Sequence, residues 1–221
     1  TLLVYIVQRD APLSVSEFVS LAESTDLSVS FIALMRIRQV HQRHYFGGGQ
    51  IADLAELCQR LRVSQVILSN PLKATYQRHI VTELNVSVID LNELIMDIFA
   101  NRAKSYEGKL QVELAQCRYL SARLKGGWTH LERQKGGIGL RGPGETQLET
   151  DRRLLQKRIS HIEKRVDKVM QTRNQNRKKR QESHQPIIGI VGYTNAGKSC
   201  LFNQLTSADV YVQQQVFATL D

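Results

Sequence analysis

The chain has 221 residues and a net charge of +9, with 42% hydrophobic and 23% charged residues, close to the average for soluble globular proteins. This composition excludes collagen-like, mucin-like and wholly disordered chains, and no apolar run reaches the roughly eighteen residues of a membrane-spanning helix. The charge is uneven: residues 1–100 hold 8 basic and 10 acidic side chains, whereas residues 101–221 hold 22 and 11. Such asymmetry favours a polyanionic partner, most plausibly nucleic acid, although a solvated basic helix face is the alternative interpretation.

The first 100 residues alternate between strand-like and helical patterns. Short apolar runs of strand length occur at 2–7, 29–34, 63–68 and 86–89. Helical spacing of apolar residues occurs at 14–23, 51–61 and 71–84. Ser14 and Glu17 have the spacing of a capping box at the start of the first helix. This βαβαβαβ order predicts an α/β subdomain over 1–100, a small parallel sheet with helices against it.

Two further helices carry apolar residues in alternating three- and four-residue steps, the pattern of a coiled-coil seam. The first seam follows Gly108 and consists of Leu110, Leu114, Cys117, Leu120 or Ser121, and Leu124. The second consists of Leu148, Leu155, Ile159, Ile162, Val166 and Val169. We therefore expect an antiparallel helical hairpin over 101–180. Its second helix holds 12 basic and 3 acidic residues between Asp151 and Arg180.

The connector between these helices, 126–146, contains seven of the 14 glycines and the only tryptophan. A structureless connector of this length is uncommon unless it is functional. Glycine lets the backbone approach a ligand, Arg and Lys pair with phosphate, and Trp and His stack on bases. We interpret it as an RNA-contacting tip; a surface loop without a partner is the alternative. The candidate RNA-binding residues are Trp128, His130, Arg133, Lys135, Arg141, Arg152 and Arg153.

A phosphate-binding motif follows a polar linker at 181–186 and a predicted buried strand at 187–191. The eight residues Gly192-Tyr-Thr-Asn-Ala-Gly-Lys-Ser199 fit G-x-x-x-x-G-K-[ST], and helical spacing comes next. Backbone N–H groups and the helix N-terminus would face phosphate oxygens, Lys198 would bridge the β- and γ-phosphates, and the Ser199 hydroxyl would ligate Mg²⁺. The separation of Thr219 from Ser199 along the sequence is about that of a switch threonine, which also reaches Mg²⁺. An ordinary loop threonine fits equally well.

No DxxG or NKxD motif follows, so the residues that would sense the γ-phosphate and read guanine are absent from these 221 residues. We expect 187–221 to be the first part of a G domain and the chain to be a fragment of a longer protein. The sequence alone leaves open whether the nucleotide is GTP or ATP. No catalytic base is identified, as expected where hydrolysis depends on positioning and electrostatics.

Four segments carry a resemblance to a known family: Gly136–Arg153, Glu107–Ala115, Gly192–Ser199 and Phe217–Asp221. They resemble the HflX family of ribosome-associated GTPases, and the first of them does so most closely. This resemblance implies that the protein binds and hydrolyses GTP with Mg²⁺, and that Asn195 helps to hold K⁺. It also implies binding to the large (50S) ribosomal subunit and its rRNA, with the glycine-rich tip near the peptidyl-transferase region, and a role in splitting or rescuing stalled ribosomes under stress.

Motif and resemblance together define a candidate nucleotide site. Its residues are Gly192, Tyr193, Thr194, Asn195, Ala196, Gly197, Lys198, Ser199, Cys200, Phe217, Ala218, Thr219, Leu220 and Asp221, with Ser199 and Thr219 as metal ligands. Two positions depart from the family pattern: Cys200 replaces the usual Thr or Ser, and Gly47–Gln50 replaces a glycine–lysine arrangement.

Two other functions remain open at this stage: a nucleotide-independent RNA- or ribosome-binding module, and an ATP-using P-loop protein. The cysteines Cys58, Cys117 and Cys200 share no CxxC spacing, which argues against a disulfide framework or a zinc site. The N-terminus lacks the features of a secretory signal. We therefore expect a cytoplasmic protein, and we expect it to be a monomer.

Overall fold

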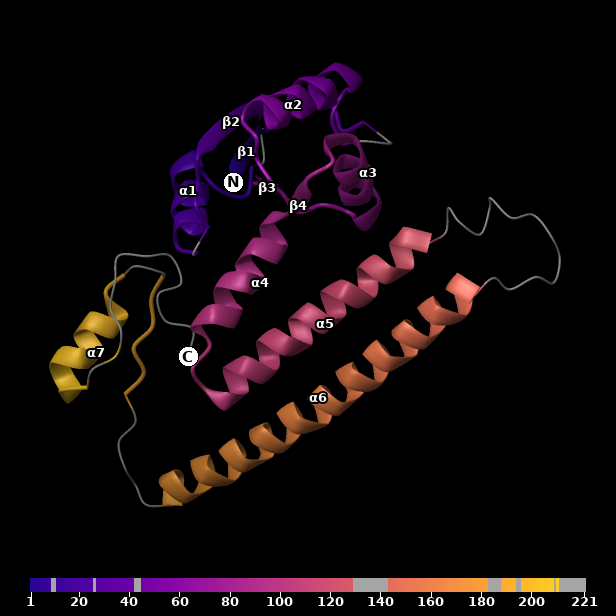
Figure 1. The fold of residues 1–221 in the computed structure, drawn as a ribbon. Coiled ribbons are helices and arrows are strands. Elements are labelled where there is room, and N and C mark those ends of the chain that lie inside the picture. The colour runs from indigo at the N-terminus through magenta and orange to yellow at the C-terminus, as the bar shows by residue number, and fades with distance from the viewer. Residues whose placement is uncertain are drawn as a thin grey trace. The chain divides into compact units, whose positions relative to one another are not determined.

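The computed structural model describes residues 1–8, 11–25, 27–41, 45–128, 143–182, 188–193, 196–208 and 210 (Figure 1). The chain divides into two compact units. One unit comprises Thr1–Ile98 and Ala122–Leu140, and the other comprises Phe99–Ser121 and Arg141–Asp221. Each unit is described below by itself.

The first unit is built on a four-stranded parallel sheet, which confirms the predicted α/β class. Its strands are β1 (Leu2–Val7), β2 (Phe31–Arg36), β3 (Gln65–Leu68) and β4 (Ser87–Ile89), in the order β2-β1-β3-β4. In the central strand β1, five consecutive residues from Leu2 to Ile6 are buried. That continuous burial is typical of a parallel strand covered on both faces.

Helices cover both faces of this sheet. Helix α1 (Val15–Glu23) packs on the side of Tyr5, whose ring centroid lies 6.3 Å from that of Phe18. Helices α2 (Gly48–Arg60) and α3 (Ala74–Leu84) pack on the opposite side. The core there joins alternate residues of β1 to both helices: Leu2, Val4, Ile6, Leu54, Cys58, Ile80 and Leu84. Alternation along β1 therefore fixes which helix lies on which face.

The helix starts follow from local hydrogen bonds. The predicted capping box is present at α1, where the Ser14 N–H donates to Glu17 Oε2 (2.8 Å) and the Glu17 N–H donates to Ser14 Oγ (3.3 Å). Helix α2 begins inside the glycine run, at Gly48, not at residue 51 as its apolar spacing predicts. Gln50 explains this earlier start, because its Oε1 accepts from the Gly47 N–H (3.1 Å) and its Nε2 donates to the carbonyl of Arg36 (2.9 Å).

Most of the predicted antiparallel hairpin lies in the second unit, whereas residues 91–98 before it and residues 122–128 at its first helix end belong to the first unit (Figure 1). Helix α4 (Leu91–Arg102) leads into α5 (Tyr106–Trp128), and α6 (Pro143–Glu182) runs back beside α5. Leu110, Cys117, Ile159 and Ile162 are buried between α5 and α6, with Leu114, Leu155, Val166 and Val169 packed around them. This confirms the seam for these eight residues, whereas Leu124 is not in the cluster and the side chain of Leu148 is not described. The open alternative is resolved in favour of Ser121, because Leu120 is 52% exposed whereas Ser121 is half-buried.

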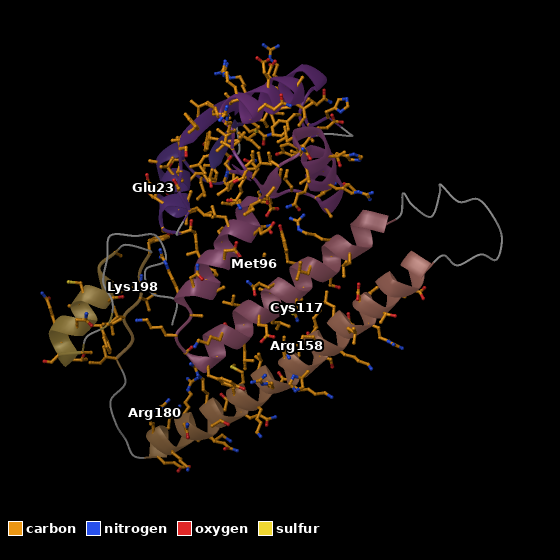
Figure 2. The ribbon with its side chains drawn as sticks, viewed as in Figure 1. Glu23, Met96, Cys117, Arg158, Arg180 and Lys198 are labelled. Carbon is orange, nitrogen blue, oxygen red and sulfur yellow. The ribbon has the colours of Figure 1, made fainter. Side chains whose placement is uncertain are left out.

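Ion pairs join the two helices outside that seam. Arg118 Nη2 lies 2.7 Å from Glu163 Oε1, Arg173 Nε lies 2.7 Å from Glu107 Oε2, and Arg158 pairs with Glu113. Figure 2 shows Cys117 on α5 and Arg158 on α6. Because the Arg118–Glu163 pair is largely exposed, it contributes little to stability, and the apolar seam remains the main source of cohesion.

Two further predictions differ from the structure, the bounds of the connector and the strand at 187–191. The helices reach into the connector predicted at 126–146: α5 continues to Trp128, and α6 starts at Pro143, since proline suits the first turn of a helix. The predicted strand at 187–191 is absent from the described residues 188–193. Ile188 is 88% exposed and Val191 is 94% exposed, so this segment has no described neighbour to complete a ladder.

Candidate functional site: the phosphate-binding loop and the basic hairpin

The phosphate-binding motif folds into a turn followed by helix α7 (Lys198–Thr206). Gly197 precedes this helix with φ +78° and ψ +11°, a left-handed conformation that favours glycine. The Leu201 N–H donates to the Gly197 carbonyl (2.9 Å) and starts the helical ladder. The second glycine of the motif is therefore required by backbone geometry.

The Lys198 side chain donates a hydrogen bond to the backbone of its own loop. Its Nζ donates to the carbonyl of Tyr193 (2.6 Å), and the Ala196 N–H donates to the same oxygen (3.3 Å). A Cβ on Gly192 would lie 3.5 Å from the Ala196 Cβ and 3.7 Å from the Lys198 stem, which is ordinary contact. The ammonium group is thus held against the backbone of its own loop, next to the N-terminus of α7, where partial positive charge favours an anion; Figure 2 labels Lys198 at this position.

The remaining predicted nucleotide residues divide into described and undescribed groups. Ser199 is half-buried in the first turn of α7, and Cys200 beside it is exposed. Thr194, Asn195, Phe217, Ala218, Thr219, Leu220 and Asp221 lie outside the described residues. The structure therefore brings Gly192, Lys198 and Ser199 together but does not test the predicted switch segment.

The donors described here fit a magnesium ion held mainly by phosphate. Within the described residues, no group of three or more His, Cys, Asp or Glu side chains could hold a metal. The Ser199 hydroxyl is an oxygen donor of the hard type that Mg²⁺ prefers, and Mg²⁺ commonly keeps waters and substrate phosphates as its other ligands. Of the two predicted protein ligands, only Ser199 is described.

Large apolar side chains around the loop are exposed. Tyr193 is 92% exposed, and on α7 Leu205 is 69%, Leu201 46% and Phe202 42% exposed. An apolar surface of this kind marks a contact site for further structure. Among the described residues, the loop and α7 therefore present an apolar surface.

The hairpin is the second candidate site, as a nucleic-acid interface. Of the seven predicted RNA-binding residues, Arg152 and Arg153 are described and exposed on α6. Trp128 ends α5, but its side chain is not described. His130, Arg133, Lys135 and Arg141 lie outside the described residues. The structure therefore does not show whether the predicted tip residues come together.

The structure adds three basic residues to Arg153 that the sequence analysis did not single out, Lys157, Lys164 and Lys168. Arg153, Lys157, Lys164 and Lys168 are exposed and share one face of α6, opposite the seam; we call these four residues the basic stripe. Their spacing of four, seven and four residues was a readable signal in the sequence. Arginines nearer the seam, such as Arg158 and Arg173, are ion-paired with α5. Among the described residues, none of the stripe residues has such a pair.

Family models match the chain in three consecutive parts. "GTP-binding GTPase N-terminal" matches residues 13–100, "GTP-binding GTPase Middle Region" matches 102–180, and "50S ribosome-binding GTPase" matches 187–221. None of the described helices combines the length and apolar character that crossing a bilayer requires.

Named relatives agree with these matches. The chain is 47% identical over 218 residues to "GTPase HflX" of Escherichia coli, which covers 99% of the chain and 51% of that protein. It is 46% identical to "GTPase HflX" of Alkalihalophilus pseudofirmus, covering 94% of the chain and 49% of that protein. The chain therefore spans about half the length of these relatives.

A solved structure shares the fold. It is the crystal structure of a GTP-binding protein from the archaeon Sulfolobus solfataricus in complex with GDP. The match has a TM-score of 0.55 and 24% sequence identity, and covers 93% of this chain and 53% of that one. At this identity the likeness supports the α/β architecture alone.

Proposed function

The chain belongs to the HflX family of GTPases, and on that premise we propose that its parent protein binds and hydrolyses GTP on the large (50S) ribosomal subunit. In this proposal the protein splits or rescues stalled ribosomes under stress and works in the cytoplasm as a monomer. The three family-model matches support a corresponding organisation: an α/β part over 1–100, a hairpin over 101–180, a linker at 181–186 and the start of a G domain over 187–221.

The position of Lys198 is the observation that carries the nucleotide part of the proposal. Its ammonium group donates to a backbone carbonyl of its own loop, 2.6 Å away, although an ammonium has three N–H donors. A triphosphate placed at the N-terminus of α7 would take the remaining donors and the loop N–H groups together. Ser199, one residue further, would reach a Mg²⁺ ion bound to the same phosphates, and Asn195 is the proposed ligand of K⁺.

The charge of the hairpin is the observation that supports the proposed binding to the large ribosomal subunit. The basic stripe presents four exposed cations on one face of α6, and Arg152 extends the charge toward the connector. RNA phosphates would bind these cations with release of counterions, which makes the affinity strongly dependent on salt. The candidate tip residues Trp128, His130, Arg133, Lys135 and Arg141 would supply stacking and further phosphate contacts.

A nucleotide-independent ribosome-binding module is the second candidate. It is favoured by one observation: the hairpin has a buried seam of its own, whose described members come from α5 and α6. Ribosome pelleting with the full-length parent separates the two functions. The first predicts that a GTP analogue increases the fraction that pellets with large subunits, whereas the module predicts equal pelleting with and without nucleotide.

Nucleotide binding is tested directly by Lys198→Ala in the full-length parent. We expect the affinity for GTP to fall by at least 100-fold, because a charged contact to buried phosphate is worth about 3 kcal/mol. The measurement is titration with a fluorescent GTP analogue, with Lys178→Ala, a charge removed from the exposed end of α6, as the matched control. Unchanged GTP affinity would contradict the phosphate-loop assignment, and stronger competition by ATP than by GTP would support the ATP-using alternative.

A further inference from the structure

A buried carboxylate joins three segments of the first unit. Asp90 follows β4, and its side chain is fully buried. Its Oδ2 accepts from the Leu72 N–H (2.8 Å), and its Oδ1 accepts from the Glu93 N–H in the first turn of α4 (2.9 Å). The third partner is Arg123 of α5, whose Nη2 lies 2.9 Å from Oδ2. One side chain therefore ties the loop before α3, the start of α4 and the last part of α5.

Arg123 makes a second contact that fixes its direction. Its Nη1 donates to Oε1 of Gln77 on α3. Gln77 is itself held, because its Nε2 donates to the Val88 carbonyl (2.6 Å) and to Glu93 Oε2 (3.2 Å). We call Gln77, Asp90 and Arg123 the anchor. A guanidinium spread between two fixed acceptors sets both the position and the rotation of the helix that carries it.

The Asp90–Arg123 ion pair is not well explained by a contribution to stability. The Arg123 side chain is only 16% exposed, so both charges lose hydration, and a buried ion pair often stabilises a fold no more than apolar residues of similar volume would. What the pair supplies is geometry. Arg123 stands five residues before Trp128, where α5 ends and the glycine-rich connector begins.

We propose that the anchor is a positioning device for RNA recognition: it fixes the last turns of α5, and thereby the base of the glycine-rich connector, before RNA binds. The inference rests on the proposed function, in which the connector contacts ribosomal RNA. Arg123 is a positioning residue here, because its guanidinium is engaged with Gln77 and Asp90 and is largely buried. Binding then carries a smaller ordering cost than it would with a loose helix end.

Salt dependence separates positioning from direct contact. Each phosphate contact adds about 0.7 to 0.9 to the slope of log affinity against log salt concentration. Removing a contacting cation lowers both the affinity and the slope. Removing a positioning residue lowers the affinity, and the slope stays the same, because no phosphate contact is lost.

The experiment measures binding of the full-length parent to large ribosomal subunits across a salt series. For Arg123→Met we expect affinity to fall on the order of tenfold with an unchanged slope. For Arg133→Ala we expect the slope to fall by about 0.7 to 0.9. Arg118→Met is the matched control, since Arg118 lies on the same helix in an exposed pair with Glu163 and should behave as wild type.

The outcomes test two separate hypotheses, the positioning role of the anchor and the RNA-contacting tip. A lower slope for Arg123→Met would show that Arg123 itself contacts phosphate, and wild-type affinity would show that the anchor does not matter for binding; either result overturns the proposal. If neutralising Arg133, Lys135 and Arg141 together also leaves affinity unchanged, the proposed RNA-contacting tip fails instead.

Three further tests guard against simple unfolding. The double variant Asp90→Asn/Arg123→Met removes the charge that the single change would leave buried without its arginine, and it should show the same loss of affinity with restored thermal stability. Hydrogen exchange should be faster at Leu124 and Lys125 in Arg123→Met, and Arg123→Lys should recover part of the affinity because it keeps the charge. Unchanged exchange at these amides would overturn the proposal.

Discussion

At the scale of single residues, the three cysteines differ in their surroundings. Cys58 is buried in the core of the first unit, Cys117 is buried in the hairpin seam, and Cys200 is exposed beside Ser199. Burial raises the pKa of the Cys58 thiol. Burial also raises the pKa of Cys117, and the nearby Glu113 carboxylate adds to this while Arg158 opposes it. Both buried thiols therefore form thiolate less readily than an ordinary cysteine.

We predict that iodoacetamide labels Cys200 first in the native protein at pH 8. Access and thiolate formation both disfavour the two buried sites, so Cys58 and Cys117 should react only after unfolding. Mass spectrometry of peptides from a labelling time course measures the three rates. Cys117 reacting as fast as Cys200 under native conditions would mean that the hairpin seam is open.

Glu17 gives a pH-dependent prediction. Hydrogen bonds from the backbone and side chain of Ser14 lower the pKa of Glu17 below its ordinary value of 4.5. A lowered folded-state pKa means that the capping box stabilises α1 above about pH 4.5 and that this stabilisation is lost as pH falls through the folded-state value. Amide exchange in α1 should be faster in Glu17→Gln than in wild type at pH 6, and the difference should shrink as the pH falls through the folded-state pKa of Glu17. A difference that does not change between pH 6 and the onset of acid unfolding would contradict this.

At the scale of helices and strands, the hairpin depends on few buried contacts. Ile162 is fully buried between α5 and α6, whereas Leu154 on the same helix is 56% exposed. We predict that Ile162→Ala lowers the free energy of unfolding by about 2–5 kcal/mol, and that Leu154→Ala changes it by less than about 1 kcal/mol. Urea denaturation followed by circular dichroism measures both. Similar losses in the two variants would show that α6 packs in another register.

Periodicity was sufficient to predict most of these elements, because a seam or a buried strand repeats over many residues. The parallel sheet and the α5–α6 seam follow from such patterns, and the Ser14–Glu17 capping box follows from one short local spacing. Helix ends were less predictable, since one side chain decides them: Gln50 starts α2 within a glycine run, and Pro143 starts α6 within the predicted loop. The contact of Asp90 with Arg123, 33 residues away, has no periodic signal and was not predicted.

The nucleotide site was predictable in part for a similar reason. The motif from Gly192 to Ser199 is local, and the helical spacing that follows it predicted a helix after the loop; in the structure that helix, α7, starts at Lys198. The strand predicted before it depends on neighbouring strands, and residues 188–193 have none among the described residues. A buried-strand pattern therefore predicts a strand only where neighbouring strands are present, and the sequence of the segment does not show whether they are.

At the scale of the whole molecule, the charge is divided unevenly along the chain. Residues 1–100 hold a slight acidic excess, and residues 101–221 hold 22 basic against 11 acidic residues. A long-range electrostatic attraction to RNA would then depend on where a charge is removed as well as on how many are removed. The two parts of the chain supply matched sets for this comparison.

We predict that replacing the whole basic stripe by glutamine lowers the salt slope of large-subunit binding by about 3, since four phosphate contacts at about 0.7 to 0.9 each are lost. The matched control removes four exposed cations from the first 100 residues, Arg38, Arg60, Arg62 and Lys73, and should leave the slope nearly unchanged. Both variants change the net charge of the chain from +9 to +5, so a non-specific charge effect predicts equal slopes. Equal slopes would contradict a defined interface on α6, whereas a selective loss would identify its outer face as the surface that meets phosphate.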